Sequence, residues 1–149
     1  MPNEEFVLWA DKHRPEVIKM RELLDTAIPD ELWELREHLV EVEAYNARMS
    51  TMLGEAERLF IEATHRELLA LGDGGGATSE RKVLVNFATK TERRVRDVIK
   101  GLCRAMEYRL MLGMSLLKTL NTELAASNTT HRGGPRTTRP LTPPSAYLR

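Results

Sequence analysis

At 149 residues, with 42% hydrophobic and 30% charged side chains, the chain has the length and composition of one soluble, unusually charge-rich domain. Aromatic residues make up only 5%, which argues against sheets, since strands recruit aromatic and β-branched side chains, and favours packed helices. The net charge of zero conceals an asymmetry, because residues 1–75 carry seventeen Asp and Glu against eight Lys and Arg, whereas residues 76–149 carry five against fourteen. These balances of −9 and +9 indicate either attraction between the two halves or an anionic partner for the basic half.

The sequence lacks the signals of secretion and of membrane insertion. Its first residues are acidic where a signal peptide is basic, and no apolar run approaches the roughly 18 residues that a membrane span needs. Cys103 is the only cysteine, so a disulfide within one chain is excluded, and its apolar neighbours predict a buried thiol. We therefore expect a cytoplasmic protein with no membrane partner.

Residues 1–29 are predicted to form an N-terminal arm and one short helix. Proline tolerates the first turn of a helix, so Pro15 is expected to open an amphipathic helix that ends near Ala27. Phe6 and Trp9 precede this helix. The large apolar area of their rings predicts that they anchor the arm to the body of the protein or to a neighbouring subunit.

A helical hairpin is predicted over residues 30–126, with a glycine-rich loop at residues 72–77. Its first helix begins after Pro29 and runs to about Leu71, with apolar residues alternating three and four apart, the heptad spacing of a coiled coil. The seam consists of Leu32, Leu35, Leu39, Val42, Asn46, Met49, Leu53, Ala56, Phe60, Ala63 and Glu67. The loop contains neither GxGxxG nor the GKS/T of a phosphate-binding loop, so we interpret it as a hairpin turn.

The second helix of the hairpin is predicted to run unbroken from Arg81 to Leu124, and its first half is densely basic. Only Glu92 and Asp97 oppose the cations there. Cations three or four residues apart share a helix face that can follow a phosphate backbone, and arginine can also stack on unpaired bases. The candidate DNA-binding residues are Arg81, Lys82, Lys90, Arg93, Arg94, Arg96, Lys100 and Arg104.

The second half of the same helix is almost wholly aliphatic. From Val98 onward, two adjoining apolar stripes form a face wider than one partner helix covers. We therefore predict a homo-oligomer, either a ring or a smaller cluster, with Ala105 and Gly113 allowing close approach between copies. The candidate oligomerisation residues are Ile99, Leu102, Met106, Leu110, Leu117, Leu120 and Leu124.

Residues 127–149 are rich in Ser, Thr, Pro, Gly and Arg and show no hydrophobic periodicity. This composition predicts a disordered basic tail. Its arginines meet no acidic residue, so the tail either contributes to nucleic-acid binding or is an inert, solvated extension.

No constellation of residues typical of an enzyme is visible. The four histidines are scattered, and Glu62 with His65 forms a lone ExxH pattern, whereas a helical di-iron site needs two such patterns and further glutamates. The single cysteine is expected to be buried, and no serine lies in a nucleophile turn. We predict a protein that is not an enzyme and has no catalytic residue, metal site or cofactor.

The loop LGDGGGATS and the segment KVLVNFATKTERRVRDVIKGLCRAMEYRLMLGMSLLKTL resemble the UvsY-type recombination mediators of tailed phages, over about residues 50–121. The resemblance implies a helical protein that forms rings, binds single-stranded DNA and helps a RecA-like recombinase to replace single-strand-binding protein. A phage-encoded member acts in the host cytoplasm. The family tends to be basic just before the loop, where this chain keeps only Arg66, so its DNA contacts are expected on the second helix and the tail.

Two functional hypotheses result. The first is an oligomeric single-stranded DNA-binding accessory protein that assists recombination or replication, as a recombinase mediator does. The second is a helical scaffold or adaptor that assembles through coiled-coil contacts without nucleic acid. In the second case the basic face pairs with the chain's own acidic helix or with an acidic protein.

Overall fold

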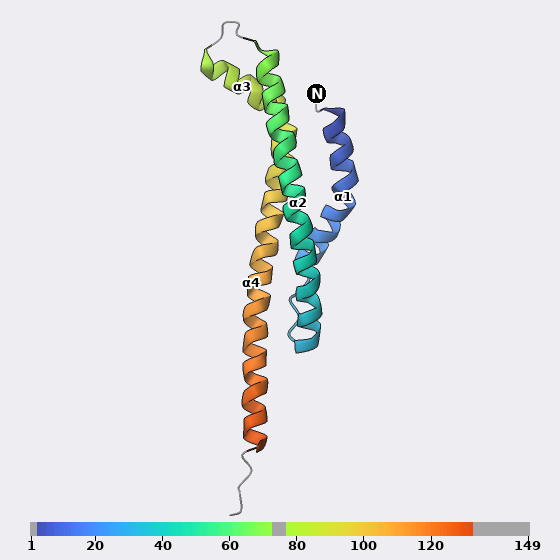
Figure 1. Cartoon of the computed structure of the whole chain (residues 1–149), viewed down its shortest axis with the longest axis vertical. Coiled ribbons are helices and arrows are strands. Elements are labelled where there is room, and N and C mark those ends of the chain that lie inside the picture. Colours follow the sequence, from blue (N-terminus) through green and yellow to red (C-terminus); the bar gives the residue numbers. More distant parts are fainter. Residues whose placement is uncertain (1–2, 73–76, 133–149) are drawn as a thin grey trace, which may run out of the picture.

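The computed structural model describes residues 3–72 and 77–132, and every regular element in these two segments is a helix (Figure 1). The helices are α1 (Glu4–Asp25), α2 (Leu32–Ala70), α3 (Thr78–Ala88) and α4 (Lys90–Arg132). The two longest, α2 and α4, lie side by side and run antiparallel, and α1 packs against both of them. The predicted all-α fold, a long helical hairpin with a short N-terminal helix, is confirmed.

Most of the predicted loop and tail fall outside the described residues. Gly72 ends the α2 side of the loop with a φ of 58°, a left-handed conformation that glycine adopts without steric cost. Residues 127–132, which the sequence assigned to the tail, continue α4, and neither glycine nor proline occurs among them. The predicted disorder of residues 133–149 lies outside the described part of the chain.

The N-terminal helix begins at Glu4, not at Pro15 as the sequence predicted. The Asn3 side chain accepts a hydrogen bond from the backbone N–H of Glu5 at 3.4 Å, and acidic residues in the first turn suit the positive end of the helix dipole. Pro15 therefore lies inside α1, where its missing N–H removes one backbone hydrogen bond. Phe6 is buried within the chain, so it anchors α1 to the body of the protein.

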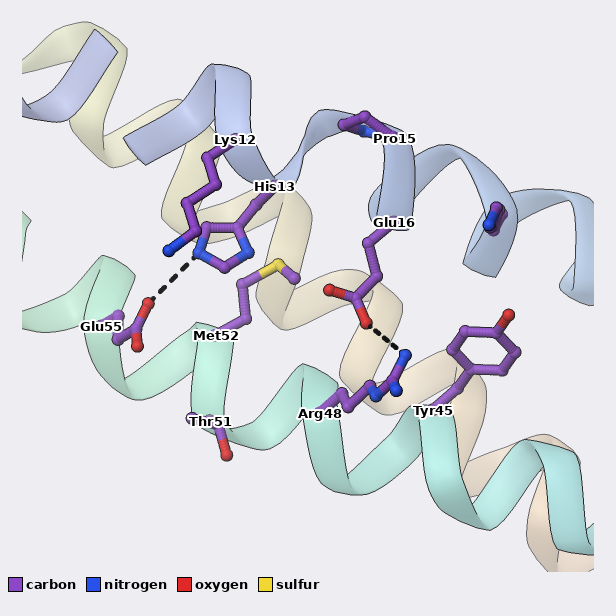
Figure 2. A pocket seen from close by; sticks show the side chains of 10 residues that line it. Lys12, His13, Pro15, Glu16, Tyr45, Arg48, Thr51, Met52 and Glu55 are labelled. Atoms are coloured by element: carbon purple, nitrogen blue, oxygen red, sulfur yellow. Dashed lines mark hydrogen bonds and ion pairs between the residues drawn. The ribbon is translucent and has the colours of Figure 1, made fainter. Parts of the chain in front are cut away.

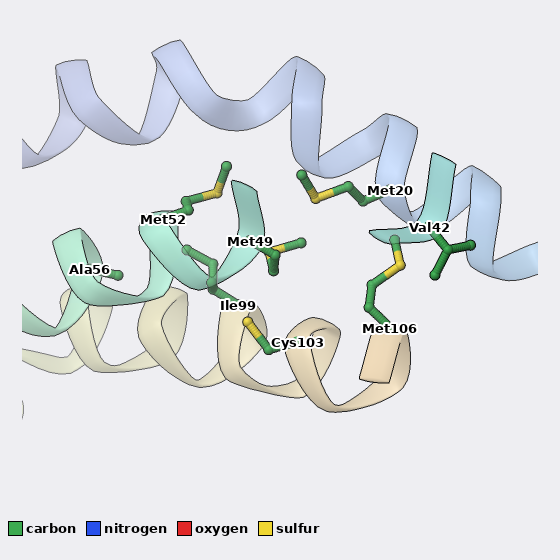
Figure 3. Packing of buried hydrophobic residues seen from close by; sticks show 8 residues of the cluster. All are labelled: Met20, Val42, Met49, Met52, Ala56, Ile99, Cys103 and Met106. Atoms are coloured by element: carbon green, nitrogen blue, oxygen red, sulfur yellow. The ribbon is translucent and has the colours of Figure 1, made fainter. Parts of the chain in front are cut away.

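The core lies where α1, α2 and α4 meet, and methionine is its commonest residue. Its most buried cluster comprises Met20, Val42, Met49, Met52, Ala56, Ile99, Cys103 and Met106 (Figure 3). An unbranched, flexible side chain fills the irregular space between three helices. Because Met20 belongs to α1, the wide apolar face of α4 is covered by two helices of its own chain.

The second arm of the hairpin is two helices, since Thr89 separates α3 from α4 and α3 turns aside from the axis of α4 (Figure 1). Thr89 is buried, and its hydroxyl donates to the backbone O of Val85 at 2.8 Å, a contact that bends helices. Arg93 Nη2 donates to the backbone O of Asn86 at 2.7 Å and to its Oδ1 at 3.0 Å, which satisfies acceptors at the end of α3. The predicted unbroken helix was therefore wrong at this point.

The close approach at Gly113 is also made within the chain. A Cβ on Gly113 would contact the side chains of Leu39 and Leu35 in α2. The sequence assigned this glycine to packing between copies, whereas it lets α2 and α4 of one chain pack tightly.

Candidate functional site

Five of the eight predicted DNA-binding residues are exposed on α3 and α4. They are Lys82, Lys90, Arg94, Lys100 and Arg104, and together they are called the basic surface below. Because the chain turns at Thr89, the basic surface follows two helices and not one straight line.

The other three predicted cations, Arg81, Arg93 and Arg96, are only partly exposed. The Arg96 guanidinium lies 4.3 Å from the centre of the Phe60 ring in α2, and its Nη2 lies 2.7 Å from Oδ1 of Asp97. Arg93 donates hydrogen bonds to Asn86 at the end of α3. These two arginines therefore contribute to the structure, a role that the sequence did not predict for them.

The acidic helix α2 does not neutralise the basic surface through direct contacts. Within residues 3–72 and 77–132, no ion pair joins a carboxylate of α2 to one of the five cations of the basic surface. The ion pairs of α2 either lie within α2 or join it to α1, as Arg48 does with Glu16 at 2.9 Å. Among the described residues, the attraction between halves that the composition suggested is therefore not seen as direct ion pairs.

Two exposed aromatic rings lie near these cations in the sequence. The Phe87 side chain is 78% exposed, between Lys82 and Lys90, and the Tyr108 side chain is 59% exposed, one helical turn after Arg104. Exposed rings beside cations are the combination by which many proteins bind unpaired nucleic-acid strands.

The predicted oligomerisation face divides into two parts. Ile99 and Met106 are 2% and 0% exposed, and Leu102 and Leu110 pack against the same core. These four residues face α1 and α2 of their own chain. The prediction that Ile99 and Met106 contact another copy was therefore wrong, because α1 occupies the part of the face that appeared uncovered.

The second part remains open near the end of α4. Leu117 and Leu120 are half-buried, and Leu124 is 51% exposed. Farther along the chain, α4 extends past the first turn of α2 (Figure 1). Met114 is exposed beside these leucines. These four residues are called the distal apolar strip, which borders a shallow groove of about 470 Å³ whose lining also includes Lys118, Asn121 and Thr122.

A polar groove of about 560 Å³ lies between α1 and α2 (Figure 2). Its Glu55 Oε2 accepts a hydrogen bond from Trp9 Nε1 at 2.6 Å and lies 3.5 Å from His13 Nε2. Arg48 and Glu16 form a second link across the same groove. Because these groups bind one another across the groove, their contacts hold α1 against α2.

A buried arginine joins three segments of the chain. Arg109 in α4 is 7% exposed, and its Nε donates to Nε2 of His38 in α2 at 2.9 Å. Its Nη1 donates to the Leu24 backbone O at 2.9 Å, and its Nη2 donates to the Thr26 backbone O at 2.6 Å. The cation therefore sits at the negative end of the α1 dipole and satisfies carbonyls that the helix leaves free.

The same contact fixes the state of His38. Because Nε2 of His38 accepts a hydrogen bond, the ring is neutral and carries its proton on Nδ1. Burial and the nearby Arg109 charge lower the pKa of His38 below 6.5, against a smaller opposing effect of Glu41. Burial also lowers the pKa of Arg109.

Sequence reasoning missed this buried cluster, although it carries a signal. Arg109 comes three residues after Met106, on the apolar face of its helix. A cation buried there requires hydrogen-bond acceptors that compensate for its lost hydration. The acceptors from Leu24 and Thr26 lie in an irregular segment, so spacing alone does not reveal them.

Burial raises the pKa of the Cys103 thiol, with Glu107 and Glu57 adding to the effect, which disfavours the thiolate. In residues 3–72 and 77–132, no three His, Cys, Asp or Glu side chains gather as metal ligands would. Across the same segments, no helix combines the length and the apolar character required to cross a bilayer.

Comparisons of this chain with protein-family models, with curated proteins and with solved structures give no match. Its function is therefore inferred from its own residues, together with the pattern resemblance described above.

Proposed function

We propose that this protein is an oligomeric, non-enzymatic accessory protein that binds single-stranded DNA and assists recombination or replication. The observation that carries the proposal is the basic surface, whose five exposed cations have no ion-pair partner on α2 within the described segments. Such cations attract a polyanion, because binding releases the counterions condensed on its phosphates.

A single strand suits this surface better than a duplex. Phe87 and Tyr108 are exposed beside the cations and offer ring faces to unpaired bases. The bases of a duplex are stacked on one another and do not present their faces. Base stacking on aromatic rings is tolerant of sequence, so the proposed binding is not sequence-specific.

Self-association would strengthen this binding. One copy has five exposed cations for phosphate contacts, which gives weak binding at physiological salt. Copies joined through the distal apolar strip hold one strand at several places, so their contacts reinforce one another by avidity. A ring and a smaller cluster both achieve this.

The resemblance to UvsY-type mediators suggests the biological step. In that role the protein holds the strand while a RecA-like recombinase replaces single-strand-binding protein. The recombinase and the single-strand-binding protein are then its protein partners, and the protein acts in the cytoplasm of a phage host.

A helical scaffold or adaptor without nucleic acid is the second candidate. Several large apolar side chains of α2 support it, since Trp33 is 68% exposed, Val40 69% and Ile61 64%. Exposed apolar side chains in number are typical of surfaces that bind other proteins.

Fluorescence anisotropy of a labelled single-stranded oligonucleotide, titrated at several salt concentrations, distinguishes the two functions. If all five cations contact phosphates, the logarithm of the affinity falls against the logarithm of the salt concentration with a slope of about −3.5, at about −0.7 per phosphate. No binding at about 50 mM salt, or binding without this slope, would contradict DNA binding and favour the adaptor.

A further inference from the structure

A second groove, between α1 and α4, is rimmed by positive charge. It has a volume of about 330 Å³, and Arg14 and Arg21 of α1 and Arg94 of α4 line it, whereas no carboxylate does. Arg14 pairs with Asp11 at 2.9 Å, but among the described residues Arg21 and Arg94 have no ion-pair partner. Arg94 is also part of the basic surface, so the groove adjoins that surface and attracts an anion.

Apart from His13, the other residues that line this groove are apolar or aromatic. Val17, Val95 and Val98 line it together with Trp9. The Trp9 ring is held in place, because its Nε1 donates to Glu55 at 2.6 Å. The ring also stacks on Phe6, with centroids 6.2 Å apart, and lies 4.9 Å from the His13 ring. A fixed aromatic ring among valines suits a flat, weakly polar group, whereas the arginines at the rim suit phosphate.

We propose that this groove seats a base of a single DNA strand, while Arg21 and Arg94 hold the phosphates on either side. The inference rests on the proposed function and deepens it, because it adds α1 to a site that sequence reasoning placed on the second arm of the hairpin and the tail. The volume lies near the lower end of the roughly 300–1,000 Å³ of ligand pockets, which fits a nucleotide and not a stacked duplex.

Tryptophan fluorescence reports on this groove directly. The chain has two tryptophans, so Trp33→Phe leaves Trp9 as the single emitter, and Trp33 is an exposed residue of α2 away from the groove. A single-stranded oligonucleotide is expected to quench the emission of Trp9 in parallel with binding measured by anisotropy. An abasic oligonucleotide of equal length and charge should bind about tenfold more weakly and quench little, since it lacks the stacking base.

A pair of charge reversals on α1 provides the matched control. Arg21→Glu places a carboxylate at the rim, which is expected to lower affinity about tenfold at low salt and to abolish quenching. Lys19→Glu makes the same change in charge two residues earlier, but Lys19 lines the groove between α1 and α2. It should leave quenching intact. Both residues are exposed, so both variants should retain the wild-type unfolding midpoint.

The outcomes separate this inference from the proposed function. If the oligonucleotide binds but Trp9 emission does not change, and Arg21→Glu behaves like Lys19→Glu, the groove is not part of the site although DNA binding stands. Stronger quenching of Trp9 by an acidic peptide than by the oligonucleotide would also overturn the groove assignment. A complete lack of oligonucleotide binding refutes the proposed function and this inference together.

Discussion

At the scale of single residues, Arg109 determines how firmly α1 is attached. Its guanidinium donates to Leu24, Thr26 and His38 from a site where it is 7% exposed. These acceptors are carbonyls and a neutral ring, so their alignment, and not a carboxylate, compensates for burying the charge. The C-terminal end of α1 is therefore held by one side chain of α4.

Arg109→Met should lower the free energy of unfolding by about 3 kcal/mol, because it leaves the buried His38 ring and two partly buried carbonyls without a donor. Arg109→Lys keeps the charge but not the planar fork, so it should lose less than Arg109→Met. Urea denaturation followed by helical circular dichroism measures both. Arg66→Met is the control, since Arg66 is exposed in α2. A loss no larger than that of the control would contradict the proposed role of Arg109.

The His38 contact also predicts a dependence of stability on pH. The pKa of His38 is lowered in the folded state, so between that value and the unfolded value of 6.5 the unfolded chain binds more protons. The stability contributed by neutral His38 is therefore complete above pH 6.5 and is lost as the pH falls through the folded pKa.

His38→Gln tests this prediction, because glutamine can accept from Arg109 but does not titrate. The variant should lose less stability than the wild type when the pH is lowered from 7 through the unfolded pKa of His38, as measured by urea denaturation at each pH. Parallel curves for the two proteins would show that His38 does not account for the loss.

At the scale of elements, periodicity identified the helices but not the interruptions between them. The seam of α2 predicted that helix almost to its ends, because heptad spacing over eleven positions has no other regular interpretation. The break at Thr89 was missed, since no glycine or proline marks it and only a buried hydroxyl and the Arg93 contact produce it. At Pro15 the sequence predicted a boundary that the structure lacks. The helix α1 begins before Pro15, because it includes the buried Phe6.

The sequence predicted the charge of the candidate site, but it did not predict which side chains its residues contact. The sequence shows that the basic residues of the second arm are concentrated in one segment, yet it does not show that Arg96 covers Phe60. Similarly, the width of the apolar face of α4 was visible, but whether α1 or another copy covers it depends on tertiary packing. Arg21 was missed because it lies far along the chain from Arg94, its partner across the groove.

The glycines of the helices give a prediction about packing. A Cβ at Gly101 meets no atom within 4 Å, so Gly101→Ala should stabilise the protein by about 0.5–1 kcal/mol through helix propensity alone. At Gly113, a Cβ would press on the buried Leu39, so Gly113→Ala should destabilise it. Chemical denaturation of both variants tests this, and an equal gain at both positions would contradict the close packing of α2 on α4.

At the scale of the whole molecule, the second arm of the hairpin carries two surfaces, and the core formed by α1, α2 and α4 lies between them. The basic surface occupies α3 and the first turns of α4, and the distal apolar strip lies near the other end of α4. The core between them is buried by α1 and α2 of the same chain. Assembly and DNA binding are therefore expected to be separable by mutation.

Met114→Asp combined with Leu124→Asp should convert the proposed oligomer to a monomer. Both side chains are more than half exposed in the chain, at 54% and 51%, so helicity should not change. Sedimentation velocity measures the assembly, and Leu8→Asp on α1 is the control, because Leu8 is 71% exposed and distant in sequence from the distal apolar strip. An unaltered sedimentation coefficient for the double variant would place the contact between copies elsewhere.

The most direct test of the central claim is the affinity of Lys100→Glu with Arg104→Glu for a labelled single-stranded oligonucleotide. Both residues are exposed, and a control with Lys12→Glu and Lys19→Glu makes the same change in net charge on the α1–α2 groove. We predict that the first variant binds about 100-fold more weakly at low salt, with a salt slope shallower by about 1.4, whereas the control stays within a few-fold of wild type. Equal losses in the two variants, or wild-type affinity in the first, would contradict DNA binding by this surface.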